Sequence, residues 1–160
     1  MRSEFVSISK EEKGKRIKIL LRVLGAALFL IAIFYAMRGD DVLKTASSIQ
    51  FLGITLFGLP IVMDYLEEKQ KPAFQKIRLY TFLVYFVQAL FTLVNRFVSM
   101  PQWSGVVVVG LQVFLIYQMM NQYMTKISSE EKSVYRNAFM WRMAFVILVT
   151  LFALLGNLLR

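Results

Sequence analysis

Five polar side chains within apolar stretches of the chain have the clearest potential for chemistry. Gln88, Thr92 and Asn95 follow one another at spacings of four and three residues, which places them on one face of a helix. Arg96 is next to Asn95, and Gln112 lies inside the following apolar stretch. An amide that faced lipid would lose the hydrogen bonds it makes in water, so these side chains should face protein or a wet cavity. This polar stripe predicts hydrogen bonding between helices, which we favour, or the lining of a polar path.

The residues needed for acid–base or metal chemistry are scarce. Cysteine and histidine are both absent, which excludes disulfides, thiol nucleophiles and zinc sites built on Cys or His. The ten carboxylates lie in connections or near the ends of apolar stretches, so no proton carrier is expected deep in a membrane. Asp64 is the carboxylate closest to an apolar stretch, and we expect it to pair with Arg22, Arg78 or Arg142. The sequence predicts no catalytic residue, no metal site and no cofactor.

The elements that must position these side chains are apolar stretches long enough to cross a bilayer. Hydrophobic residues make up 58% of the 160 residues, compared with about 45–50% in soluble domains. A helix that crosses a bilayer needs about 17–25 residues. We therefore predict an all-α, polytopic membrane protein with a basic N-terminal segment at residues 1–16 and a five-helix transmembrane bundle at 17–159. The predicted spans are residues 17–37, 45–65, 79–97, 103–123 and 140–159.

Basic residues are distributed unequally between the two sides of these spans. Of the 19 Lys and Arg residues, seven lie in or just after the N-terminal segment, four between the second and third spans, and four around the start of the fifth. Only Arg38, Lys44, Arg96 and Arg160 fall on the other side. Because basic flanks stay in the cytoplasm, this distribution predicts a cytoplasmic N-terminus, an external C-terminus and residence in the cytoplasmic (plasma) membrane.

The net charge of +9 indicates which anions the protein meets. The basic N-terminal segment lacks interleaved aromatic residues and precedes a membrane span, which favours the anionic lipid of the inner leaflet over nucleic acid. The residues expected to contact anionic lipid are Lys13, Lys15, Arg16, Lys18, Arg22, Arg78 and Arg142.

Two local patterns predict how helices begin and pack. The motif I-S-x-E-E-K occurs at residues 8–13 and 127–132, and its S-x-x-E spacing is that of a capping box. We therefore predict helix starts at Ser9 and at Ser128. Gly25 and Ala32, seven residues apart in the first span, predict a face on which another helix approaches closely.

These features favour a small, non-enzymatic integral membrane protein that acts through helix–helix contacts. It would serve as an accessory, regulatory or immunity-like subunit of a membrane complex, with another membrane protein or a second copy of itself as partner. The alternative is a small transporter or channel lined by the polar residues of the third and fourth spans. A third hypothesis is a lipid-modifying enzyme that uses Asp64, Glu67 and Glu68 at the membrane interface.

Overall fold

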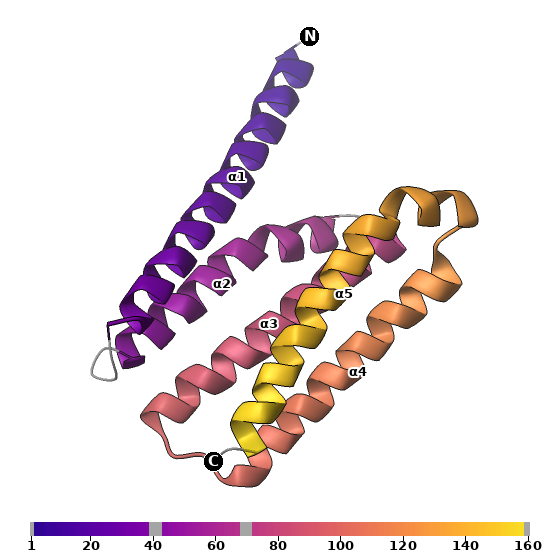
Figure 1. Ribbon diagram of the computed structural model, residues 1–160. Helices are drawn as coiled ribbons and strands as arrows, with labels where there is room; N and C mark the ends of the chain where they lie inside the picture. The colour runs from indigo at the N-terminus through magenta and orange to yellow at the C-terminus, as the bar shows by residue number, and fades with distance from the viewer. Residues whose placement is uncertain (1, 39–42, 68–71, 159–160) are drawn as a thin grey trace. The chain divides into compact units, whose positions relative to one another are not determined.

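The computed structural model describes residues 2–38, 43–67 and 72–158, and the regular structure of this part of the chain is entirely helical (Figure 1). The helices are α1 (Arg2–Ala36), α2 (Leu43–Glu67), α3 (Ala73–Phe97), α4 (Gln102–Lys126) and α5 (Ser129–Leu158). All five are long and apolar enough to cross a membrane, which confirms the predicted all-α fold with five membrane-length helices. The chain divides into two compact units, Met1–Pro60 and Ile61–Arg160, and the boundary falls within α2.

In the first unit, the backbones of α1 and α2 approach each other closely at two glycines. A Cβ atom at Gly25 would lie 2.5 Å from the backbone nitrogen of Phe57 and 2.7 Å from the carbonyl oxygen of Gly53. The antiparallel register then places Ala32 opposite Ala46, seven residues from each glycine, and both alanines are buried. Small residues allow such an approach where no hydrophobic force drives helices together. The close approach predicted for this face of α1 is confirmed.

The predicted helix start at Ser9 is wrong, because α1 begins at Arg2 and continues through this position. The segment from residue 2 to residue 16 contains no proline, and it is rich in Lys and Glu, which are good helix formers. The one weak position, Gly14, costs about 1 kcal/mol in a helix interior and does not break it. A capping-box spacing therefore did not mark a boundary here, since the residues before it are also compatible with a helix.

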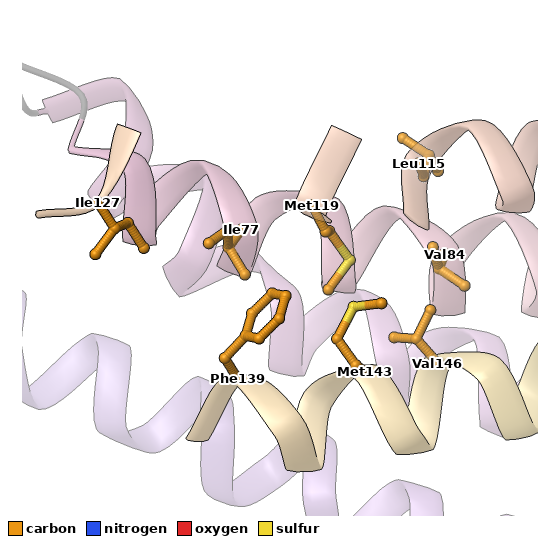
Figure 2. Packing of buried hydrophobic residues seen from close by; sticks show 8 residues of the cluster. All are labelled: Ile77, Val84, Leu115, Met119, Ile127, Phe139, Met143 and Val146. Atoms are coloured by element: carbon orange, nitrogen blue, oxygen red, sulfur yellow. The ribbon is translucent and has the colours of Figure 1, made fainter. Parts of the chain in front are cut away.

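The second unit contains α3, α4 and α5, which pack against one another (Figure 1). Pro72 and Pro101 directly precede α3 and α4, where a proline's fixed φ and missing N–H suit the start of a helix. Figure 2 shows the core between them, in which side chains of α5 point toward those of α3 and α4. The core cluster consists of Ile77, Val84, Leu115, Met119, Ile127, Phe139, Met143 and Val146.

The start of α5 has the reciprocal hydrogen bonds of a capping box. The backbone N–H of Glu131 donates to the Ser128 hydroxyl at 3.3 Å, and the backbone N–H of Ser128 donates to the Glu131 carboxylate at 3.2 Å. The preceding residue, Ile127, is buried in the core cluster. Lys132 donates from Nζ to the carbonyl oxygen of Met124 at 2.9 Å and so satisfies the end of α4. The predicted helix start at Ser128 is confirmed.

Candidate functional site

The antiparallel packing of α3 and α4 brings two glutamines together. Thr81 Oγ1 lies 3.8 Å from the sulfur of Met119. Gln88 follows Thr81 by seven residues on α3, Gln112 precedes Met119 by seven residues on α4, and these two glutamines are also in contact. The same face of each helix is thus repeated two turns apart, as 3.6 residues per turn requires. This register places both glutamines well inside their helices.

Gln88, Thr92 and Gln112 form a polar layer between α3 and α4, in which Gln88 and Thr92 are half-buried. Gln112 is fully buried, and its Nε2 donates to Gln88 Oε1 at 2.9 Å. Gln88 Nε2 in turn donates to Thr92 Oγ1 at 3.4 Å. Gln112 Oε1 is buried and accepts no hydrogen bond from the residues that the structure describes. The layer therefore consists of linked amide and hydroxyl groups, with one carbonyl acceptor left open.

The α4–α5 register adds Thr150 to the level of this layer. Tyr123 and Phe139 stack with ring centroids 3.9 Å apart, and Gln112 and Thr150 each lie eleven residues from that stacked pair, on the antiparallel helices. Thr150 is buried and donates its hydroxyl hydrogen to the carbonyl oxygen of Val146 at 3.0 Å. Sequence reasoning did not place this residue with the stripe. No pattern in the sequence relates Thr150 to Gln112, because only the packing of α5 on α4 brings the two residues to one level.

Asn95 and Arg96, also assigned to the stripe, lie apart from the layer. The side-chain oxygen of Asn95 accepts a hydrogen bond from the backbone N–H of Met100 at 3.3 Å, within the connection to α4. Arg96 is exposed in the last turn of α3, where a positive charge interacts favourably with the helix dipole. The predicted stripe thus has two parts. Gln88, Thr92 and Gln112 link α3 to α4, whereas Asn95 bonds to the connection between these helices.

Five of the seven basic residues assigned to anionic lipid lie on α1 in the first unit. Lys13, Lys15 and Arg16 are exposed, whereas Lys18 and Arg22 are half-buried. Their exposure is compatible with contact to a charged surface, because long basic side chains can extend from a helix toward headgroups.

Arg78 and Arg142, the other two, belong to the second unit. Arg78 Nη2 lies 3.8 Å from Asp64 Oδ2, which confirms that Asp64 pairs with one of the nearby arginines. The guanidinium carbon of Arg142 lies 5.5 Å from the ring centroid of Phe74, and this ring stacks on Tyr135 at 4.3 Å. This aromatic pair was not predicted from the sequence, because only the packing of α5 on α3 brings the two rings together and places Arg142 over Phe74.

The layer can donate and accept hydrogen bonds, but it supplies neither a carboxylate nor an imidazole. Within the described residues, no group of three or more acidic side chains could hold a metal ion. No protein-family model matches the chain, and no curated protein or solved structure is similar to it.

Proposed function

We propose that this chain is a small, non-enzymatic protein of the cytoplasmic membrane that acts through contacts between transmembrane helices. It would be an accessory, regulatory or immunity-like subunit of a membrane complex, with its N-terminus in the cytoplasm and its C-terminus outside. The absence of Cys and His from the whole chain supports a role other than catalysis.

The observation that carries the proposal is the hydrogen bond between Gln88 and Gln112. A side chain that lined a water-filled path would be wet, whereas Gln112 is fully buried and uses its amide nitrogen to join two helices of the same unit. Hydrogen bonds between transmembrane helices are worth about 0.6–2 kcal/mol each. Packing within the unit can thus account for Gln88, Thr92 and Gln112 without a wet path, and this supports the helix-contact hypothesis over the channel.

The outward face of α4 offers a position suited to a partner helix. Gly110 is exposed, and a Cβ atom placed there would meet nothing within 4 Å. It is surrounded along the helix by the exposed side chains of Val106, Val107, Val113 and Phe114. A glycine among apolar side chains lets a second transmembrane helix approach closely, because association within lipid depends on van der Waals contact.

Replacement of Gly110 by leucine tests this function. We expect Gly110→Leu to leave thermal stability unchanged or slightly raised, since the site is open and leucine is a better helix former than glycine. After mild crosslinking in native membranes, the Gly110→Leu variant should recover much less of a membrane partner, or of a differently tagged second copy, than the wild-type chain does. Gly14→Leu is the control, because Gly14 is also open but lies near the start of α1.

Flux measurements in proteoliposomes supply the opposing outcome. The helix-contact function predicts no solute flux above that of empty vesicles. Solute flux that Gln112→Leu abolishes, together with unchanged crosslinking of Gly110→Leu, would contradict the proposal and favour a channel.

A further inference from the structure

Two arginines of the second unit lie near each other where α3 meets the first half of α5. Arg142 projects from α5 two turns after Tyr135, about 10 Å along the helix axis at 1.5 Å per residue. Helical side chains lean toward the N-terminus of their own helix, so Arg142 extends back toward the beginning of α3. There its guanidinium lies over the ring of Phe74. Arg78 follows Phe74 by four residues, so the two share one face of α3, and its like charge acts on Arg142.

The positive charge of this pair is not balanced by what surrounds it. Both arginines are half-buried. Arg78 is 3.8 Å from Asp64, a loose ion pair that lies beyond hydrogen-bonding distance. Among the residues that the structure describes, no carboxylate forms an ion pair with Arg142. Partly buried charges of one sign are unfavourable unless an opposite charge compensates them.

We propose that Arg142 and Arg78 bind a phosphate group at this contact of α3 and α5. Guanidinium groups match phosphate because their paired N–H donors engage two oxygens at once, and two arginines can share one phosphate. The stacked rings of Phe74 and Tyr135 would hold the Arg142 side chain in place through its cation–π contact. Asp64 would compete with the phosphate for Arg78.

The location favours a phosphate from a membrane lipid. Lys76, Lys126 and Arg136 lie at the same end of the unit. With Lys132, Arg78 and Arg142 they outnumber the described carboxylates of that end, which are Asp64, Glu67, Glu130 and Glu131, so the net field is positive and attracts anionic headgroups. This site is distinct from the polar layer, because Arg78 precedes Gln88 by ten residues on α3. The site also shares no residue with the face of α4 around Gly110, so a failure to bind phosphate would leave the proposed function untouched.

The test measures lipid retained by the full-length protein in native mass spectrometry. The protein is equilibrated with mixtures of phosphatidic acid and phosphatidylcholine, and in a parallel arm with inorganic phosphate at matched ionic strength. We expect the wild-type chain to retain phosphatidic acid selectively, and Arg142→Gln to weaken that retention about tenfold, as loss of a charge-assisted hydrogen bond implies. Arg96→Gln, on an exposed arginine in the last turn of α3 and so at the other end of the unit, is the control and should change retention less than twofold.

A second variant separates binding from a merely structural role. Asp64→Asn removes the carboxylate that competes for Arg78, so we expect phosphatidic acid to bind several-fold more tightly. If the wild-type chain binds inorganic phosphate in the parallel arm and Arg142→Gln does not, the same site is supported, with free phosphate as the ligand. Equal losses in the Arg142→Gln and Arg96→Gln variants, or weaker binding in Asp64→Asn, would overturn the proposal.

Discussion

The bond between Gln88 and Gln112 shows how a single pair of residues can fix the register of two helices. Apolar side chains would pack in several registers with similar energies, whereas these amides find each other in only one. The stabilisation is modest in lipid, because a polar group in a separated helix also finds partners.

A double-mutant cycle measures this pair. Gln88→Leu removes the acceptor for Gln112 and leaves a fully buried amide without a partner, so we expect it to lower the free energy of unfolding by about 1–2 kcal/mol. The double variant Gln88→Leu with Gln112→Leu should lose less than the sum of the two single changes. The coupling should be about 0.6–1.7 kcal/mol, measured by unfolding in a denaturing detergent. Strict additivity would mean that the hydrogen bond contributes nothing.

At the scale of elements, the contact of α1 with α2 depends on the absence of a side chain. A methyl group at Gly25 would lie too close to backbone atoms of α2, which cannot move aside as a flexible side chain can. The two helices would have to separate, and the contacts along their register, including the level of Ala32 and Ala46, would loosen together.

We therefore expect Gly25→Ala to destabilise the first unit by about 1–3 kcal/mol, the usual cost of overpacking. Gly14→Ala is a matched control on the same helix, where nothing lies within 4 Å of the new methyl group. It should be neutral or stabilising by up to about 1 kcal/mol, because alanine favours helix more than glycine does. Thermal unfolding of both variants in the same lipid or detergent checks the difference, and equal behaviour would contradict the close approach.

At the scale of the whole molecule, the sequence predicts elements better than it predicts the contacts between them. Five apolar stretches predict five helices because the length and composition of a span are local properties. The capping box at Ser128 is likewise local, and it was recognised correctly. The same motif at Ser9 misled, because the residues before it extend the helix to Arg2.

The partners of each side chain depend on how helices rotate about their axes, which periodicity does not determine. Spacing placed Gln88, Thr92 and Asn95 on one face, yet only packing shows that Gln112 bonds to the first while Asn95 serves a turn. Likewise, Phe74 and Tyr135 are 61 residues apart in sequence. Their rings stack, and Phe74 contacts the guanidinium of Arg142, only because α3 and α5 pack together.

The orientation of the helices across a membrane is also a property of the whole chain, and it yields the last prediction. The uneven distribution of the 19 basic residues should keep the connection around Gln70 in the cytoplasm and place Arg160 outside. A phosphatase reporter, active only outside, should be active after Arg160 and silent at Gln70, and a fluorescent reporter that folds only inside should show the reverse. Because five is an odd number, the N-terminus and the C-terminus of the chain must lie on opposite sides of the membrane if every helix crosses it. External activity at both positions would mean that one helix does not span, and reversed activity at both would reject the charge-based orientation.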